Sequence, residues 1–228
     1  MKNIITDIFF DLDHTLWDFE RNSAITFEII LKEYKVNIPL EQFLEIYVPL
    51  NFRYWKLYRE EKITKSELRY ARLKETFNAI HYDTSDDLIN TLSGRYIELL
   101  PEQNHLFDNT TALLNYLKER YTLHIITNGF EEIQEKKLHN SAIRPFFKNV
   151  VNSEMVGVKK PNPKIFEFAL EKAGVSPVKS VMVGDSLEAD ILGAKNVGMQ
   201  TIHFNSTNDP EHEHGIIVTD LLEIKNYL

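Results

Sequence analysis

Cysteine is absent from this sequence, which also lacks a long apolar run and an excess of positive charge. Without cysteine the chain has no disulfide framework, no thiolate nucleophile and no thiolate zinc site, which fits a reducing compartment. No apolar segment approaches the roughly 20 residues that a membrane-spanning helix needs. The apolar N-terminal segment is interrupted by Thr6 and Asp7, so it lacks the form of a secretory signal. We therefore expect a cytoplasmic protein with no membrane partner.

Positive charge is scarce: 26 Lys and Arg residues stand against 34 Asp and Glu residues, giving a formal net charge of −8. Nucleic-acid polymers bind through clustered basic residues, so this balance argues against such a partner. A small anionic substrate stays compatible, because one local cation or metal ion can override the mean charge. The 228 residues, of which 43% are hydrophobic, suffice for one medium domain or a core with a small second unit.

Three short apolar segments each end in a polar cluster. They are Ile4–Phe10, Leu123–Ile126 and Val181–Val183, and helical patterns separate them. Such segments are typical of buried parallel strands joined by helices, and therefore of an α/β fold with a parallel sheet. Ligands bind beyond the carboxyl ends of the strands in open parallel sheets. A functional site is thus expected where the three polar clusters meet.

Three helices are predicted in this α/β part of the chain. The clearest begins after Asn162, a suitable N-cap, with Pro163 at its first position and Gly174 at its end. Its apolar residues recur at helical spacing. The segments Phe130–Leu138 and Leu187–Val197 show helical patterns as well.

Residues 17–101 have almost no strand pattern and are rich in helix-forming residues. We expect an all-helical cap domain here, inserted into a catalytic core made of residues 1–16 and 102–228. A helical lobe that only adds stability is the alternative, but the insertion leaves and re-enters beside the first strand end, which favours the cap. Four helices are expected in this insertion: Glu28–Tyr34, Leu40–Leu50, Ser66–Ile80 and Ser85–Leu100.

The segment after the first strand contains two acids, Asp11 and Asp13, separated by one residue. Two carboxylates with different surroundings can act as nucleophile and as general acid/base. Taken alone, the pair is better explained as a turn that its Asp side chains stabilise. Its interpretation depends on what the other strand ends supply.

The second strand end supplies Thr127 and Asn128, and Lys160 follows further along the chain. A hydroxyl group followed by free backbone N–H groups is suited to phosphate oxygens. A lysine at a helix start can neutralise phosphate and keep a nucleophile ionised. A simple turn at Thr127 and a solvated lysine are the alternatives, and the latter explains Lys159 and Lys164 well.

The third strand end supplies Asp185 and Asp190, where strand gives way to helix. Hard oxygen ligands at such a place suit Mg²⁺. Acids that interact with a helix dipole are the alternative, which explains Glu188 better than Asp185. Each signal is modest alone, but their order and their common position at strand ends are jointly specific.

The chain resembles the aspartyl-nucleophile phosphatase branch of the haloacid dehalogenase superfamily. The resemblance lies in four segments, which contain Asp11 and Asp13, Thr127 and Asn128, Lys160, and Asp185 and Asp190. The predicted helical insertion is similar to the type-one cap of that superfamily. The segment His14–Asp18, with Asn22 shortly after it, resembles the pyrimidine 5′-nucleotidases with house-cleaning activity. Many relatives have glycine where this chain has His14.

The resemblance implies a Rossmann-like core and a two-step reaction. Asp11 would attack phosphorus and form an aspartyl-phosphate, while Asp13 would protonate the leaving oxygen and later deprotonate water. The resemblance further assigns the remaining groups. Mg²⁺ would bind Asp11, the carbonyl of Asp13, Asp185 and Asp190, and phosphate would bind Thr127, Lys160 and backbone N–H groups that include the one at Asn128.

The expected activity is Mg²⁺-dependent hydrolysis of nucleoside 5′-monophosphates, including non-standard pyrimidine ones. A phosphatase or phosphomutase for small sugar phosphates or phosphoglycolate is the second possibility, since the four segments do not separate the two reactions. An inactive binding module is disfavoured because every catalytic position is chemically competent. Asp13 argues against dehalogenation, because the dehalogenases of this superfamily lack the second acid. Oligomeric state is left open.

Aromatic and histidine side chains outside these segments are further candidates for ligand contacts. In the insertion, Phe52, Trp55 and Tyr58 fall at helical spacing, which favours core packing over stacking on a nucleobase. Trp17 is the better candidate to meet a substrate. The pair His212 and His214 is expected in a solvated surface loop rather than in a metal site.

Overall fold

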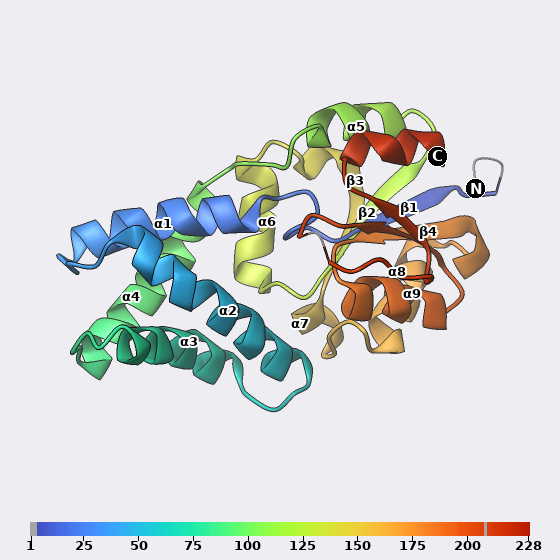
Figure 1. The fold of residues 1–228 in the computed structure, drawn as a ribbon. Coiled ribbons are helices and arrows are strands. Elements are labelled where there is room, and N and C mark those ends of the chain that lie inside the picture. Colours follow the sequence, from blue (N-terminus) through green and yellow to red (C-terminus); the bar gives the residue numbers. More distant parts are fainter. Residues whose placement is uncertain (1–3, 208) are drawn as a thin grey trace. The chain divides into compact units, whose positions relative to one another are not determined.

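The computed structural model describes residues 4–207 and 209–228, which form two compact units (Figure 1). The first unit combines the chain up to Phe19 with Asn104–Leu228. The second unit is Glu20–Gln103. No helix in the described part of the chain is long and apolar enough to cross a membrane.

The first unit is built on a six-stranded sheet in which every neighbouring pair is parallel. Its strand order is β3-β2-β1-β4-β5-β6, so β1 lies near the middle, between β2 and β4. This arrangement, with helices around the sheet, confirms the predicted α/β Rossmann-like fold class. The strands are β1 (Asp7–Phe10), β2 (Thr122–Thr127), β3 (Phe147–Asn152), β4 (Ser180–Gly184), β5 (Gln200–Phe204) and β6 (Ile216–Val218).

The three strands predicted from the sequence are β1, β2 and β4, which are neighbours in the sheet. Phe10 pairs with Ile125 on one side and with Val183 on the other, so the carboxyl ends of these strands lie at one level. One end point was wrong: β1 begins at Asp7, because Ile4 is 61% exposed and lies outside the sheet.

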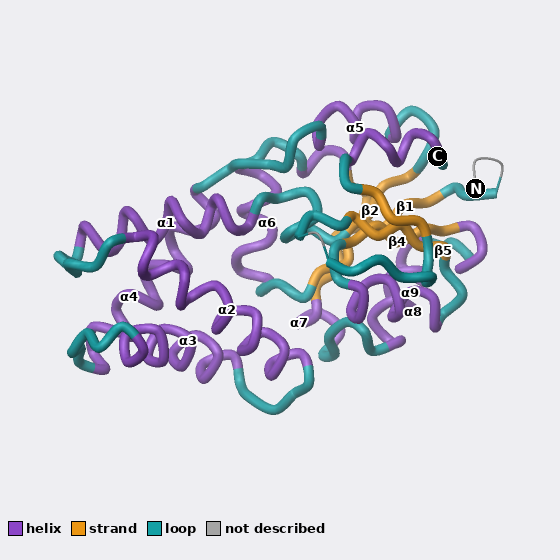
Figure 2. The backbone as a smooth tube through the Cα atoms, viewed as in Figure 1, coloured by secondary structure: helices purple, strands orange, loops and turns teal. Residues whose placement is uncertain are grey.

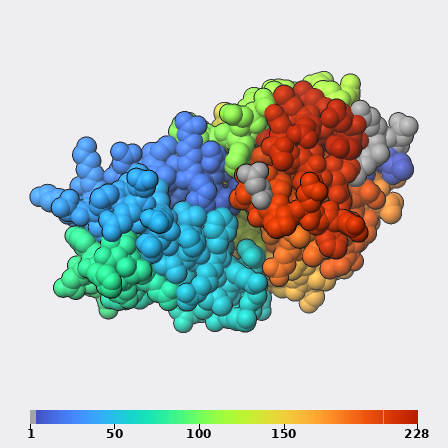
Figure 3. All heavy atoms as spheres, viewed as in Figure 1, coloured from blue at the N-terminus to red at the C-terminus, as the bar shows by residue number. Residues whose placement is uncertain are grey.

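Helices cover both faces of the sheet (Figure 2). Leucines of α5 (Thr110–Leu117) are buried, and Tyr116 of this helix donates a hydrogen bond to the carbonyl of Leu228. Segments far apart in sequence therefore lie side by side on one face, as the space-filling view also shows (Figure 3). On the other face, α8 (Pro163–Ala173) and α9 (Gly193–Asn196) pack on β1 and β4 through a cluster that includes Phe9 and Met182.

The sequence signals of α8 are confirmed. The Asn162 side chain accepts a hydrogen bond from the N–H of Lys164, and Gly174 ends the helix with a φ of 73°. The predicted helix 130–138 is α6 (Glu131–Asn140), and a short α7 (Ser153–Val156) follows β3.

The segment 187–197 is helical as predicted, but it is not one regular α-helix. Leu187–Leu192 forms a π-helix, and α9 follows it directly. The carbonyl of Ser186 accepts hydrogen bonds from the N–H groups of both Asp190 and Ile191 at its start. Single π-turns often occur at functional sites.

The second unit contains four α-helices in its described residues, which lie within the predicted insertion and precede a short 3₁₀-helix at Leu100–Glu102. They are α1 (Phe19–Glu33), α2 (Leu40–Arg59), α3 (Lys65–Ala79) and α4 (Asp86–Leu99). Two predicted bounds were too short, since α1 begins nine residues before Glu28 and α2 continues nine residues past Leu50.

An aromatic cluster forms the core of this unit. Phe27, Phe43, Tyr47 and Tyr96 are all buried, and the ring of Phe27 contacts each of the other three rings. The predicted core position of Phe52 is wrong: its side chain is 43% exposed, because the buried face of α2 is one that includes Tyr47.

Candidate active site

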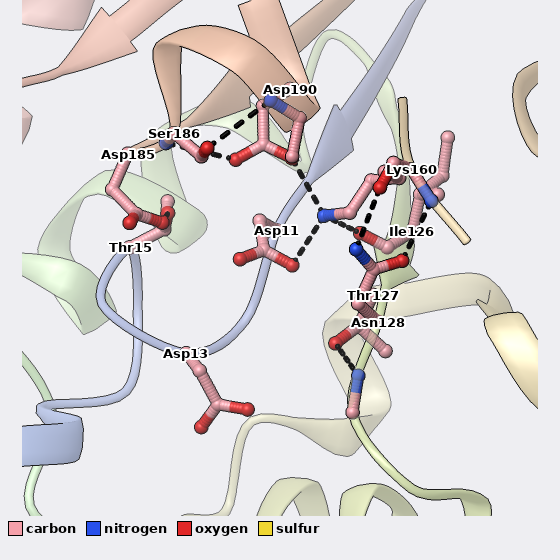
Figure 4. A network of polar contacts seen from close by, with 12 residues as sticks. Asp11, Asp13, Thr15, Ile126, Thr127, Asn128, Lys160, Asp185, Ser186 and Asp190 are labelled. Atoms are coloured by element: carbon pink, nitrogen blue, oxygen red, sulfur yellow. Dashed lines mark hydrogen bonds and ion pairs between the residues drawn. The ribbon is translucent and has the colours of Figure 1, made fainter. Parts of the chain in front are cut away.

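Three carboxylates from two strand ends meet in the first unit. Asp11 follows β1, whereas Asp185 follows β4 and Asp190 lies in the π-helix beyond it. Each offers one oxygen atom, and these three oxygens lie within 4.8 Å of one another (Figure 4). The parallel sheet thus gathers side chains that are far apart in sequence.

Lys160 is the cation of this cluster, and its side chain is 2% exposed. Its Nζ atom lies 2.7 Å from Asp11 Oδ1 and 2.7 Å from Asp190 Oδ1. The ammonium group also donates to the carbonyl of Ile126 at 2.8 Å. One lysine therefore bridges the ends of three elements, and the predicted alternative of a solvated side chain is wrong for it.

The side chain of Asn128 holds the backbone of Lys160. Its Oδ1 atom accepts the N–H of Lys160 at 2.8 Å, and its Nδ2 atom donates to the carbonyl of the same residue at 3.0 Å. Both polar atoms of the amide are thereby engaged. The side chain fixes the lysine loop, while the backbone N–H stays the group predicted for phosphate.

The charges of the cluster shift its proton affinities. Burial raises the pKa of Asp11 well above its ordinary value, and the charge of Lys160 opposes this shift. Burial and the charge of Asp190 raise the pKa of Asp185 to about 7. Burial lowers the pKa of Lys160, but the charges of Asp11 and Asp190 outweigh it and raise that pKa overall. Three acids with one buried cation form a site that further positive charge would stabilise.

Asp185 and Asp190 are each fixed by hydrogen bonds. Thr15 donates its hydroxyl to Asp185 Oδ1 at 3.0 Å, and the N–H of Ser186 donates to Asp190 Oδ2 at 3.1 Å. The close approach of Asp190 requires glycine at 184, because a Cβ atom there would lie 2.4 Å from Asp190 Oδ2.

The loop after β1 folds back on itself and presents Asp13 separately. The carbonyl of Leu12 accepts N–H groups of Leu16 and Trp17, both at 2.9 Å. His14 adopts a φ of 64°, a left-handed conformation that glycine adopts more readily. The Asp13 side chain is outside the group of three close carboxylates. It lies instead against α6, where Lys137 and Gln134 bind it.

Thr127, at the end of β2, has a hydroxyl group that accepts two hydrogen bonds. The N–H of Gly129 donates to Oγ1 at 3.0 Å, and Gln134 Nε2 donates at 2.8 Å. A hydroxyl oxygen has two lone pairs and one proton. With both lone pairs engaged, the proton is the group that Thr127 can offer to a ligand.

The predicted site residues thus fall into two groups in the structure. The first group is one polar cluster of Asp11, Lys160, Asp185 and Asp190, with Thr127 and Asn128 beside it on the β2 end. The second group is Asp13 alone, which lies against α6. Trp17, predicted as the aromatic side chain that meets a substrate, has a fully buried side chain. That prediction is wrong for this structure, because its ring lies 4.0 Å from Lys137 Nζ instead.

Three side chains at the site were missed by the sequence reasoning. Gln134 and Lys137 lie on α6, and their three-residue spacing is the one feature of the sequence that places them on a common helix face. The charged residues around them make this spacing hard to recognise. His203 on β5 is buried, and its Nε2 atom donates to the carbonyl of Asp185 at 2.6 Å. His203 Nδ1 also lies 2.9 Å from His212 Nε2. His212 lies in a loop, as predicted, but it is half-buried, and its ring stacks on that of His203.

Comparison with known proteins places this geometry in a family. The family profile described as "Hydrolase: haloacid dehalogenase-like hydrolase" matches residues 7–198. Pyrimidine 5′-nucleotidase PynA of Streptococcus pneumoniae is 36% identical over 207 residues, covering 90% of this chain and 86% of that protein. Pyrimidine 5′-nucleotidase YjjG of Escherichia coli is 34% identical over 214 residues, covering 93% and 91%.

A solved structure resembles the chain over nearly its whole length. It is the HAD-hydrolase YfnB from Bacillus subtilis bound to magnesium, with a TM-score of 0.88, 26% sequence identity and coverage of 98% of both chains. The crystal structure of YfnB is described as revealing interdomain movement.

Proposed function

Because this chain belongs to the haloacid dehalogenase-like hydrolases, we propose that it is a Mg²⁺-dependent phosphomonoesterase that acts on nucleoside 5′-monophosphates, pyrimidine ones above all. The observation that carries the proposal is the buried Lys160–Asp11 pair inside a cluster of three carboxylates, with a second acid, Asp13, held apart. The pyrimidine preference rests on the relatives named above and on the segment His14–Asp18.

Asp11 is the proposed nucleophile. Its Oδ1 atom is bound to Lys160, and its Oδ2 atom is the oxygen left to attack phosphorus in line with the ester bond. The new bond joins this oxygen to phosphorus as the bond from phosphorus to the 5′-oxygen breaks. Water then attacks the aspartyl-phosphate, which releases inorganic phosphate and restores the carboxylate.

Asp13 is the proposed general acid/base. It gives a proton to the departing 5′-oxygen in the first step and takes one from the attacking water in the second. Its surroundings differ from those of Asp11, since Lys137 and Gln134 contact it rather than Lys160. Two acids in separate environments can divide these roles.

The equatorial phosphate oxygens would be held by groups from three segments. The Thr127 hydroxyl proton, the Lys160 ammonium group and backbone N–H groups around Leu12, Asp13 and Asn128 are the proposed donors. Charge-assisted hydrogen bonds of this kind stabilise the charge of the transferring phosphoryl group.

The donor set fits Mg²⁺. Asp11, Asp185 and Asp190 supply hard carboxylate oxygens. Burial, together with the charges of neighbouring carboxylates, raises the pKa of Asp11 and of Asp185 despite the presence of Lys160, so a further cation would favour their ionised forms. These three residues would hold the ion, together with the carbonyl of Asp13. When bound, Mg²⁺ shields the repulsion between the Asp11 carboxylate and the phosphate and orients the phosphoryl group.

We also propose roles for the rest of the chain. The helical insertion, predicted at residues 17–101, would act as a cap domain that contributes substrate specificity. The protein would act in the cytoplasm on small phosphorylated molecules, without a nucleic-acid polymer or a membrane as partner. The absence of cysteine and the net charge of −8 support this assignment.

Removal of the metal is expected to abolish phosphate release. Protein treated with EDTA and dialysed should release phosphate from UMP only after Mg²⁺ is added back, whereas Ca²⁺ should restore little, because its larger, flexible coordination fits a compact site poorly. Colorimetric phosphate release measures the outcome. Full activity of the metal-free protein would refute the magnesium assignment, and no release with any metal would refute the enzyme assignment.

A substrate panel tests the specificity. We expect higher kcat/KM for UMP, CMP and dTMP than for AMP, ribose 5-phosphate, glyceraldehyde 3-phosphate or phosphoglycolate. Better turnover of the sugar phosphates or of phosphoglycolate would replace the nucleotidase assignment with the second possibility. Transfer of phosphate to sugar without release into water would identify a mutase.

Replacing Gly184 with alanine is expected to lower phosphate release about a hundredfold, because small displacements of site groups have effects of this size. The new Cβ atom would collide with the carboxylate of Asp190, at distances of 2.4–2.6 Å, and push it from Lys160. Gly94→Ala is the matched control, since a Cβ atom at Gly94 meets nothing within 4 Å. Equal activity of both variants would show that the place of Asp190 is not critical.

A further inference from the structure

Helix α6 holds the carboxylate of Asp13 at both oxygens. Lys137 Nζ lies 2.5 Å from Asp13 Oδ1, and Gln134 Nε2 donates to Oδ2 at 2.9 Å. The two side chains are three residues apart, so they project from one face of the helix. Both are buried, with exposed fractions of 3% and 1%. Two buried donors thus converge on one loop carboxylate.

Gln134 also joins Asp13 to Thr127. An ionised carboxylate can accept hydrogen bonds but cannot donate them. The Gln134 amide must therefore turn its NH₂ group towards Asp13. That NH₂ group has two protons, and the second donates to Thr127 Oγ1 at 2.8 Å. The amide oxygen Oε1 is buried without a hydrogen-bond partner in the described part of the chain. Gln134 therefore keeps this orientation although its own acceptor is left unsatisfied.

The close approach of Gln134 depends on Gly129. A Cβ atom at position 129 would lie 1.7 Å from Gln134 Nε2, so a larger residue there would displace the amide. The turn after β2 thus leaves room for a side chain that reaches Asp13.

Lys137 is fixed by aromatic rings as well as by the carboxylate. Its Nζ atom lies 4.0 Å from the ring centre of Trp17 and 5.2 Å from that of Phe19. A cation over an aromatic face is attracted to it, and more strongly where water is excluded. The buried Trp17, which follows Asp13 by four residues, therefore supports the lysine that binds Asp13.

From these contacts we propose that Lys137 and Gln134 are positioning residues, which hold the Asp13 carboxylate in the orientation that proton transfer to the leaving oxygen requires. This inference rests on the proposed function. The loop around Asp13 is short, and a single carboxylate without such partners could rotate. The two donors act through Asp13 and are not proposed to touch the substrate.

A leaving-group comparison tests the inference. Proton donation matters for the basic 5′-alkoxide of UMP and matters little for p-nitrophenolate, which leaves without a proton. Positioned general acids contribute about a hundredfold or more to rate. We expect Lys137→Met to lower kcat/KM for UMP about a hundredfold and kcat/KM for p-nitrophenyl phosphate less than about tenfold. The comparison uses kcat/KM because this constant reports the step in which the leaving group departs, whereas the later hydrolysis of the aspartyl-phosphate is common to both substrates. Gln134→Leu should show the same pattern with smaller losses.

Two controls separate positioning from general structural damage. Lys136→Met removes an exposed neighbour on the same helix and should behave as wild type on both substrates. In the Asp13→Asn background, Lys137→Met should lower kcat/KM for UMP by no more than about twofold, because residues that act as a unit are non-additive. Equal losses on both substrates, or a full further loss in the Asp13→Asn background, would overturn the inference.

The remaining outcomes are also decisive. If Lys137→Met does not fold, Lys137→Arg keeps the cation with a different reach, and selective loss on UMP is the result expected of it; a loss without selectivity would count against the inference. A wild-type protein that hydrolyses neither substrate refutes the proposed function itself. A wild type active on both, beside a Lys137→Met variant of unchanged activity, refutes only the positioning role.

Discussion

Asp11→Asn is expected to lower phosphate release from UMP at least about a thousandfold, to the limit of detection. A neutral amide cannot attack phosphorus as the carboxylate does, so no covalent intermediate can form. The amide oxygen can still accept the hydrogen bond that Lys160 gives to Oδ1 at 2.7 Å. The variant should therefore fold, and steady-state phosphate release with near-wild-type thermal melting measures both statements.

The complementary variant makes the assignment sharper. In Asp13→Asn the nucleophile is intact, but both proton transfers are impaired. Because p-nitrophenolate leaves without a proton, acid-quenched protein should carry a phosphoryl group on Asp11 after exposure to p-nitrophenyl phosphate. Mass spectrometry of a peptic digest locates that group. Residual turnover of Asp11→Asn above a few per cent of wild type, after deamidation back to aspartate is excluded by the same digest, would remove Asp11 from the nucleophile role.

The central strands could be read from the sequence because each combines continuous burial with an abrupt polar end. The strands β3, β5 and β6 lacked that signal. Lys148 and Asn149 interrupt β3, and its burial pattern is mixed. In β5 a polar residue, His203, is buried and donates a hydrogen bond to the backbone of Asp185, so the strand has no continuous apolar run. A three-residue strand such as Ile216–Val218 is too short for any periodicity.

Site residues at strand ends were predictable for a topological reason. In a parallel sheet all carboxyl ends lie at one edge, so Asp11, Thr127 and Asp185 must come near one another whatever the loops do. Gln134 and Lys137 could not be found in this way. The sequence of α6 is EEIQEKKLHN, in which Lys137 looks like any solvated lysine. Only the tertiary contact with Asp13 and Trp17 distinguishes it.

The contacts of Lys160 could likewise be predicted only in part from the sequence. Its position before a helix suggested a phosphate contact, whereas the bonds to Asp11, Asp190 and the carbonyl of Ile126 depend on the fold. The hydrogen bonds between the Asn128 side chain and the backbone of Lys160 could not be predicted either, because they join residues 32 positions apart.

Lys160→Met is the second change with a large expected effect. We expect kcat/KM to fall at least about a hundredfold, because the phosphate loses a buried cation and Asp11 loses its partner. A loss smaller than about tenfold, roughly 1.4 kcal/mol of transition-state stabilisation, would make the residue peripheral. Lys164→Met, which removes an exposed lysine nearby, is the matched control and should retain wild-type activity.

The pH dependence of the same variant identifies why activity is lost. Burial raises the pKa of Asp11, and Lys160 lowers it, so removing the lysine raises that pKa further. Since only the ionised carboxylate attacks, the acid limb of the kcat/KM profile should move to higher pH in Lys160→Met, and the deficit should shrink as the pH rises. A loss of the same size at every pH would mean that Lys160 acts on the phosphate alone. An acid limb shifted to lower pH would contradict the role assigned to the Lys160–Asp11 pair.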